Sequence, residues 1–235
     1  MHRNWRIFFS AALAVVFTGL VLVGCGSSVP GAEKVKRPAV ESSELQFTTP
    51  TEGDTVATIE TTIGKIQVVL YTDKAPQACD NFIGLAKQGF YNETGFSRLE
   101  HGFVVEGGIN NDGFTTTIWN GSGFAPEYTD SLHHYSGALC APVDENGQCN
   151  GAFYFMQTMP DSVDDALAAQ MSETGYRQEV IDAYKAAGGA PYLDFTDTVF
   201  GHVYQGMDIV DTIAQSAEAE EPVQILSVTV STYSK

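Results

Sequence analysis

The sequence predicts a mainly β domain, a closed antiparallel barrel with helical caps. Many short apolar runs with strand-like alternation are separated by turn residues, a pattern typical of small β-barrels. One helical pattern comes early and one late, as expected for helices that close the ends of a barrel. The 235 residues contain no second set of apolar segments large enough for an independent core, so one domain is expected.

The first elements are a hairpin and a helix. Strands are expected at residues 56–60 and 65–71, joined by a turn in which Gly64 supplies backbone freedom. Pro76 suits the first position of a helix, and Cys79 and Phe82 begin an apolar face at helical spacing. Gly89 is expected to follow the end of this helix.

The remaining elements alternate between strands, one long loop and helices. Two short strands are predicted at 96–99 and 103–106, followed by a Gly- and Asn-rich loop to residue 123. A helical insert near 161–190 is expected to consist of two helices broken near Gly175. The other expected segments are strands at 137–141, 152–156, 198–203 and 223–232, and a helix at 206–215.

The N-terminus has the organisation of an export signal. Arg3 and Arg6 precede an uncharged apolar run at residues 7–23, and Gly24 stands directly before Cys25. This ending resembles the lipobox of bacterial lipoproteins, so residues 1–25 are predicted to be a signal peptide and Cys25 the lipidated residue. An uncleaved membrane anchor is the alternative. Both place the domain outside the cytoplasm, and the lipid would hold it on the cell membrane.

Residues 26–54 contain several Pro, Ser and Thr and no sustained apolar pattern. We expect a flexible tether there, followed by the folded domain at 55–235. The formal net charge of −17 excludes non-specific binding to nucleic acid, because such a surface repels phosphates. No spacing of Cys and His residues indicates a metal site, and the adjacent His133 and His134 lack a third ligand.

Three cysteines follow Cys25. Cys79 lies in the predicted first helix, where a small buried apolar residue is expected. Cys140 and Cys149 flank a loop and could form a disulfide in an oxidising compartment. The sequence leaves open whether they do.

Arg98 is the most informative charged residue. It lies in an otherwise apolar strand, within residues 96–108, and Val104 and Glu106 follow on the next strand. It could point into solvent, as most arginines do. Alternatively, it could be a fixed cation beside an apolar patch, where it would bind a polar group of a ligand.

Four motifs in order resemble the cyclophilin family of peptidyl-prolyl isomerases over residues 55–235. The order implies an eight-stranded barrel. The motifs are Ala75-Pro76 with Asn81-Phe82; Phe96-Ser97-Arg98-Leu99 with Gly102-Phe103 and Gly107-Gly108; 137–141 with 152–155; and Thr198-Val199-Phe200-Gly201 with 206–210.

The resemblance implies that Arg98 is the catalytic residue. It also implies a substrate site for proline formed by Phe103, Val104, Glu106, Tyr154, Tyr192 and Leu193. Several of these positions depart from the family pattern. Glu106 replaces a glutamine, Tyr154 a phenylalanine and Tyr192 a tryptophan, while Ser97, Pro142, Val143, Ala152 and Asp197 replace other family residues.

The implied reaction is rotation about the X-Pro bond, which needs neither metal nor cofactor. Amide resonance sets a barrier of roughly 20 kcal/mol, and a guanidinium can stabilise the twisted state in which the prolyl nitrogen regains its lone pair. Glu106 could orient Arg98 or compete for it as an ion-pair partner.

The expected partners are proline-containing unfolded or exported polypeptides, and a monomer is expected. The alternative function is a chaperone module that binds proline segments with weak or no isomerase activity. The replaced residues at positions 97, 106, 142, 143 and 152 motivate this alternative.

Overall fold

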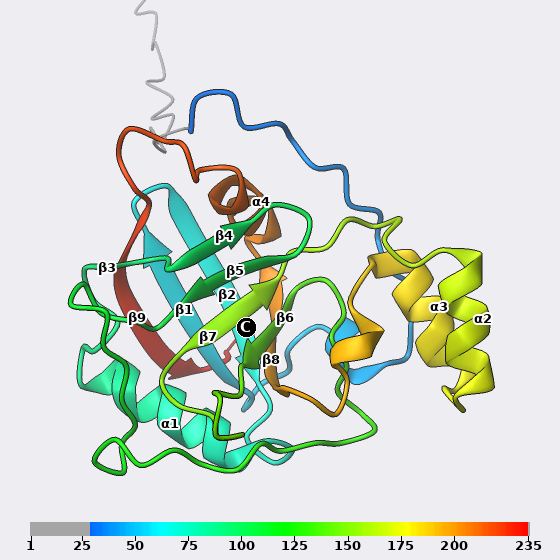
Figure 1. Cartoon of the computed structure of the whole chain (residues 1–235), viewed down its shortest axis with the longest axis horizontal. Helices are drawn as coiled ribbons and strands as arrows, with labels where there is room; N and C mark the ends of the chain where they lie inside the picture. The colour runs from blue at the N-terminus through cyan, green and yellow to red at the C-terminus, as the bar shows by residue number, and fades with distance from the viewer. Residues whose placement is uncertain (1–28, 235) are drawn as a thin grey trace, which may run out of the picture.

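A single curled antiparallel sheet organises the chain (Figure 1). The computed structural model describes residues 29–234, so the predicted signal peptide and Cys25 lie outside the described residues. The sheet contains nine strands in the order β3-β9-β1-β2-β8-β6-β7-β5-β4. The strands are β1 (Thr55–Thr61), β2 (Gly64–Leu70), β3 (Thr94–Gly95), β4 (Arg98–Glu100), β5 (Val104–Gly107), β6 (Ala138–Ala141), β7 (Phe153–Met156), β8 (Thr198–Gln205) and β9 (Gln224–Thr232).

The prediction of a closed eight-stranded barrel is wrong in detail. The two edge strands, β3 and β4, are separated by only two residues of chain, so the sheet must curl until its edges approach each other. No hydrogen-bonded ladder joins these edges within residues 29–234. The chain passes from β3 to β4 through residues 96 and 97. There the Ser97 amide donates a hydrogen bond of 2.8 Å to the carbonyl of Glu106 on β5.

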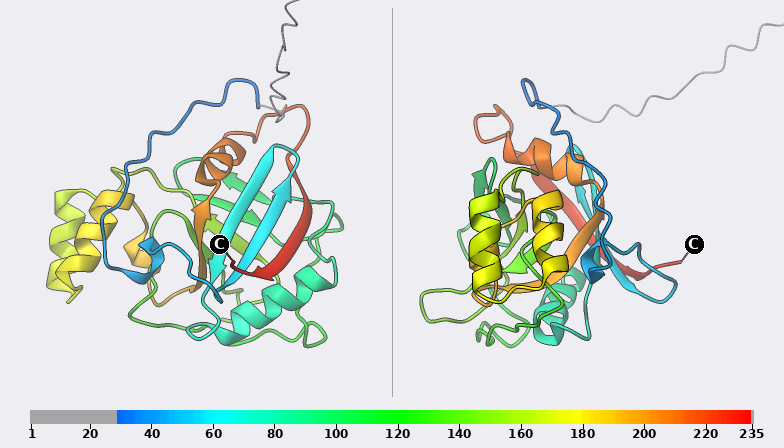
Figure 2. Two further views of the ribbon diagram at one scale, coloured as in Figure 1. Left: turned by 180° about the vertical axis from the view of Figure 1, so that it is seen from behind. Right: turned by 90° about the vertical axis from the view of Figure 1, so that its right-hand side faces the viewer.

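Two helices close the curled sheet at opposite ends, as the sequence predicts (Figures 1 and 2). They are α1 (Pro76–Lys87) and α4 (Met207–Ala214). Phe82 and Leu85 of α1, with Val210 and Ile213 of α4, belong to the same interior apolar cluster. Burying these side chains together removes apolar surface from water, which fixes both helices on the sheet.

The helical insert also forms as expected, as α2 (Asp165–Glu173) and α3 (Gln178–Ala187). The pair lies to one side of the sheet (Figure 1) and has its own small apolar cluster around Tyr135 and Tyr184. Two short 3₁₀ helices, η1 (Leu45–Phe47) and η2 (Pro191–Leu193), complete the secondary structure. None of the helices within residues 29–234 is long and apolar enough to span a bilayer.

Residues 29–54 lie against the folded domain, whereas a flexible tether was predicted for residues 26–54. Figure 2 shows this segment running along the domain from the end near α4 to the helical insert. Gln46 and Glu44 are buried, and Arg37 forms an ion pair with Asp211 of α4. A Pro- and Ser-rich composition predicted disorder, but buried polar contacts along the segment supply the ordering that apolar periodicity did not indicate.

The possible disulfide between Cys140 and Cys149 is not formed. All three cysteines within residues 29–234 are free and buried. Cys140 lies in the outer apolar cluster with Tyr154, whereas Cys149 lies in the interior cluster. Because the two side chains pack on different faces of the sheet, the short sequence separation does not bring their sulfur atoms together.

Candidate functional site

The candidate site lies on the outer face of strands β4, β5, β7 and β6. In the observed register Arg98 pairs with Glu106, Glu106 pairs with Tyr154, and Tyr154 pairs with Cys140. Residues paired across neighbouring strands point to the same face, so these side chains form one row across the sheet. Alternation sends Val105 and Phe155 into the interior cluster instead.

The loop after β5 requires glycine at Gly108. Its φ is +84°, and a Cβ atom there would lie 2.3 Å from the carbonyl oxygen of Gly151. Only a residue without a side chain allows this close approach of two backbones. Gly107 and Gly108 of the motif therefore fix the end of β5, and with it the position of Glu106.

Arg98 is a surface residue that is nevertheless held in place. Its side chain is 49% exposed, and Nη2 donates to Oε2 of Glu100 at 2.6 Å. Nη1 lies 4.0 Å from Oε2 of Glu106, and the guanidinium carbon is 5.3 Å from the ring centroid of Phe103. The two interpretations of Arg98 are thus not exclusive, because a cation fixed by carboxylates and an aromatic ring also faces solvent.

An apolar patch lies beside this cation. Phe103, Val104, Tyr154 and Leu193 all belong to the outer apolar cluster. Val104 and Tyr154 are buried and form its floor, whereas Phe103 and Leu193 are partly exposed. The structure therefore brings together six of the seven predicted site residues of the domain: Arg98, Phe103, Val104, Glu106, Tyr154 and Leu193.

Tyr192 lies at the rim rather than in the patch. Its side chain is 66% exposed and it is absent from the outer apolar cluster. Partial burial and the nearby Glu100 carboxylate raise the pKa of its hydroxyl. Tyr192 is thus near Glu100, and a bound peptide could reach it without displacing any buried residue.

Glu106 is the more buried of the two carboxylates near Arg98, with a side chain 20% exposed. Burial raises the pKa of this carboxyl, Arg98 lowers it, and Asp197 raises it again; the net direction is upward. Desolvation therefore outweighs the attraction of the guanidinium. This is consistent with the 4.0 Å separation, which is longer than a hydrogen bond.

Asp197 is a site residue that was missing from the predicted set. Its Oδ2 accepts from the Tyr154 hydroxyl at 2.8 Å, and its Oδ1 accepts from the Val143 amide at 3.1 Å. The sequence contained one indication of this contact, because Tyr154 and Asp197 both depart from the family pattern. Because Tyr154 and Asp197 are 43 positions apart in the sequence, only the fold, which brings β7 against the segment after η2, shows their contact.

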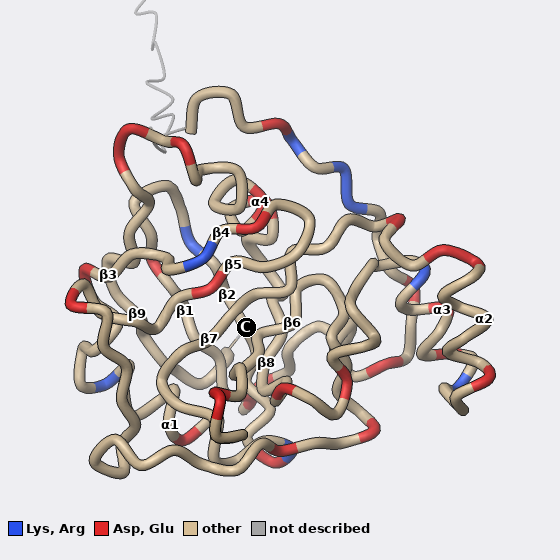
Figure 3. The backbone as a smooth tube through the Cα atoms, viewed as in Figure 1, with Lys and Arg blue, Asp and Glu red and all other residues tan. Residues whose placement is uncertain are grey.

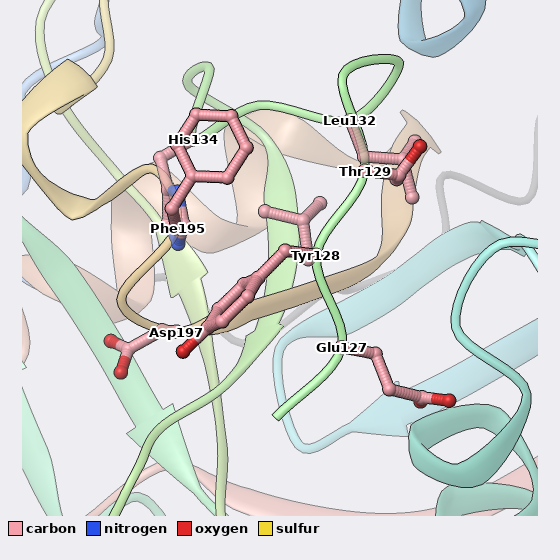
Figure 4. A pocket seen from close by; sticks show the side chains of 8 residues that line it. Glu127, Tyr128, Thr129, Leu132, His134, Phe195 and Asp197 are labelled. Carbon is pink, nitrogen blue, oxygen red and sulfur yellow. The ribbon is translucent and has the colours of Figure 1, made fainter. Parts of the chain in front are cut away.

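Asp197 also lines a small cavity, together with side chains of residues 127–134 and Phe195 (Figure 4). Its volume of about 10 Å³ holds no more than one water molecule. A proline ring does not fit there. Beside Arg98, the members of the outer cluster that remain partly exposed are Phe103 and Leu193.

His133 and His134 lie deeper, where they contact one buried carboxylate. Their Nδ1 atoms are 2.9 Å and 2.8 Å from the two oxygens of Asp194. Burial would raise the pKa of Asp194, but the hydrogen bonds from the two histidines lower it well below its usual range. No cluster of three or more metal-ligating side chains occurs within residues 29–234.

A family model described as cyclophilin type peptidyl-prolyl cis-trans isomerase/CLD matches residues 56–230. The chain is a member of the cyclophilin family of peptidyl-prolyl cis-trans isomerases. The match includes β2 to β8, both capping helices and the insert in full, and most of β1 and β9. It therefore includes the whole row of site residues on the outer face of the sheet.

Two relatives of this cyclophilin are named as peptidyl-prolyl cis-trans isomerases. A putative peptidyl-prolyl cis-trans isomerase of Staphylococcus saprophyticus is 28% identical over 187 residues, covering 79% of this chain and 94% of that protein. One from Staphylococcus aureus strain USA300 is 30% identical over 165 residues, covering 65% of this chain and 83% of the relative.

Solved structures share the fold of this cyclophilin. A Cryptosporidium parvum cyclophilin type isomerase aligns with a TM-score of 0.58 at 18% identity, covering 77% of this chain and 99% of that one. The same protein in the presence of the dipeptide Ala-Pro aligns with a TM-score of 0.57. At this identity the likeness extends to the fold alone.

Proposed function

We propose that this cyclophilin accelerates rotation about X-Pro bonds in polypeptides outside the cytoplasm and so assists their folding. The observation that carries the proposal is a guanidinium held next to an open apolar patch. The Arg98 guanidinium lies over the ring of Phe103, and Val104 and Tyr154 form the floor of the patch beside it. A protein of the same fold was crystallised in the presence of the dipeptide Ala-Pro, which supports a proline-containing substrate.

The chemistry would follow from this geometry. The proline ring packs on Val104 and Tyr154 while the preceding carbonyl rotates. Arg98 donates a hydrogen bond to the prolyl nitrogen as the amide loses conjugation. Each tenfold acceleration requires about 1.4 kcal/mol of preferential stabilisation of the twisted state, which one charge-assisted hydrogen bond can supply.

The test is the isomerisation rate of a proline tetrapeptide in a protease-coupled assay with the full chain. Arg98→Ala should lose most of the acceleration, because Arg98 is the only predicted donor to the prolyl nitrogen. Lys65→Ala is the matched control, since Lys65 is an exposed cation on β2 paired with Glu60. Unchanged activity in Arg98→Ala, with native circular dichroism, would refute the proposed mechanism.

A proline-binding chaperone module is the second candidate, and the position of Arg98 between two carboxylates favours it. Peptide binding measured by titration, without acceleration in the coupled assay, would decide for this function. Loss of both binding and acceleration in Arg98→Ala would instead support the enzyme.

We further propose that lipid on Cys25 holds the domain at the membrane as a monomer. Val29 already packs against the interior cluster, and the four residues from Cys25 to Val29 span at most roughly 14 Å. The domain would then lie close to the membrane surface rather than at the end of a long tether. Cys25→Ala should move the protein from the membrane fraction to the soluble fraction; continued membrane association would favour an uncleaved anchor.

A further inference from the structure

The N-terminal segment makes two buried polar contacts with the domain, and both lead to the proline site. We define the strap as residues 37–47, which cross the domain from α4 to the helical insert (Figure 2). Figure 3 shows basic residues along the N-terminal segment before the helical insert, and one of them, Arg37, pairs with Asp211 of α4. Beyond this point the strap turns toward α3, and its buried residues are Glu44 and Gln46.

Arg37 is the first contact. Its Nε and Nη2 donate to the two oxygens of Asp211 at 2.8 Å and 2.6 Å, and Nη1 donates to Ser136 Oγ and to the carbonyl of Thr158. The side chains of Arg37 and Asp211 are 18% and 5% exposed. Such a fork fixes the orientation of the carboxylate as well as its charge.

The oriented carboxylate of Asp211 is also in contact with Gln157, which follows β7 and is completely buried. Gln157 Nε2 donates to Asp211 Oδ1 at 2.8 Å, and its Oε1 accepts from the amide of Gly102 at 2.7 Å. Its own amide donates to the carbonyl of Phe103 at 2.7 Å. Gln157 therefore holds the turn between β4 and β5 at two successive residues.

That turn sets one wall of the site. Phe103 lies in the outer cluster and carries the ring 5.3 Å from the Arg98 guanidinium carbon. A shift of the turn would move the apolar wall and the cation together. A continuous path of hydrogen bonds thus runs from Arg37 through Asp211 and Gln157 to Phe103.

The second contact leads to Leu193, another residue of the patch. Gln46 is buried, donates to the carbonyl of His133 at 2.9 Å and accepts from its amide at 2.6 Å. His133 Nδ1 in turn contacts Asp194, the residue that ends η2. Leu193 of η2 packs on the outer cluster, as Phe103 does, so this path also ends at the patch.

We propose that the strap positions the proline site, with Arg37 and Gln157 acting as positioning residues for Phe103 and Arg98, and Gln46 for Leu193. The inference rests on the proposed role of Arg98 and its apolar patch. The folded domain alone would be an incomplete isomerase, because Phe103 and Leu193 of its site both depend on contacts with the segment before β1. Misplacement of a reacting group by about 1 Å can cost roughly 100-fold in rate.

The experiment compares variants of the full chain. Gln157→Met removes both side-chain hydrogen bonds of Gln157 but keeps the side-chain volume and the ion pair between Arg37 and Asp211. We expect kcat/KM to fall by about tenfold, which is less than the roughly 100-fold loss for a displacement of about 1 Å. In Arg37→Met, kcat/KM should fall by a similar factor. In Arg37→Lys the loss should be smaller, because lysine keeps the charge but cannot make both hydrogen bonds to Asp211 in the same geometry. Lys36→Met is the matched control: it removes the neighbouring exposed charge and should leave activity unchanged.

A double-variant cycle separates positioning from general stability. If Arg37 acts through Gln157, the double variant loses no more than the worse single variant; independent effects would multiply. The rate is measured where circular dichroism shows each variant to be native. A native Gln157→Met variant with full activity, or multiplying losses, would overturn the proposal.

The amide resonance of Gly102 in a ¹H–¹⁵N spectrum gives a readout that does not require turnover. Arg37→Met should shift it and Lys36→Met should not. If the wild-type chain accelerates no peptide but this resonance shifts, the proposed function fails while the strap contact stands. An unmoved Gly102 resonance in Arg37→Met refutes the strap pathway even in an active enzyme.

Discussion

Replacing Glu100 by glutamine should raise the activity of this cyclophilin. Glu100 Oε2 is 2.6 Å from Arg98 Nη2, closer than Glu106 at 4.0 Å. In the proposed mechanism Arg98 must turn toward the substrate, so the bond to Glu100 competes with the bond to the prolyl nitrogen. The glutamine keeps the size of the side chain and removes only its charge.

The size of the effect follows from the exposure of the pair. The two side chains are 49% and 53% exposed, and ion pairs at such positions contribute about 0.2–1 kcal/mol. If the whole of that energy is released in the variant, kcat/KM rises by roughly 1.4- to 5-fold. Because the ion pair between Arg98 and Glu100 is exposed and is screened by salt, the increase in kcat/KM should be largest at low ionic strength.

The assay is protease-coupled isomerisation at about 0.01 M and about 0.15 M salt, between which the Debye length falls from roughly 30 Å to 8 Å. Wild-type activity should rise with salt toward that of the variant. Glu173→Gln, an exposed carboxylate on α2, controls for the change in net charge. A fall in activity on Glu100→Gln would refute the reasoning, because it would mean that Glu100 orients Arg98 productively.

Three further predictions concern Glu106, His202 and the cysteines. Glu106→Gln should preserve or raise the isomerisation rate, and a large loss would show that the carboxylate itself is required. Complete burial lowers the pKa of His202 to about 3. Below pH 6.5 the unfolded chain therefore gains a proton that the folded chain does not, and the free energy of unfolding should fall by about 2 kcal/mol between pH 7 and pH 5. In urea unfolding, the free energy of unfolding of His202→Gln should fall less between pH 7 and pH 5 than that of the wild type. An equal fall in both proteins would contradict the role given to His202. Without reductant, a thiol reagent should leave Cys79, Cys140 and Cys149 unmodified in the folded protein and should alkylate all three after denaturation. A disulfide between Cys140 and Cys149 would instead protect those two positions.

Local signals in the sequence sufficed for most of the secondary structure. Gly64 and the flanking alternation predicted the first hairpin, and Pro76 and Gly89 bounded α1 to within two residues. The break near Gly175 separated α2 from α3 as expected. These features depend on backbone preferences and side-chain periodicity within a few residues, which a single sequence records directly.

The partners of the site residues were less accessible. The sequence indicated Glu106 as a carboxylate near Arg98, but it did not indicate Glu100, which forms the shorter contact. Asp197 was recognised as a departure from the family, while its bond to Tyr154 was not foreseen. Both errors concern side-chain direction, which depends on strand register and on the turn at Gly102 rather than on residue type.

The sequence by itself determined the mainly β architecture, the helical insert and the candidate site, because motif order and periodicity are encoded along the chain. Only the tertiary structure decided that the sheet stays open between β3 and β4, that Cys140 and Cys149 face different clusters, and that residues 37–47 form part of the folded unit. The physical reason is the same in each case. Contacts such as that between Arg37 and Asp211 join residues 174 positions apart, and no local propensity can report a partner at that distance.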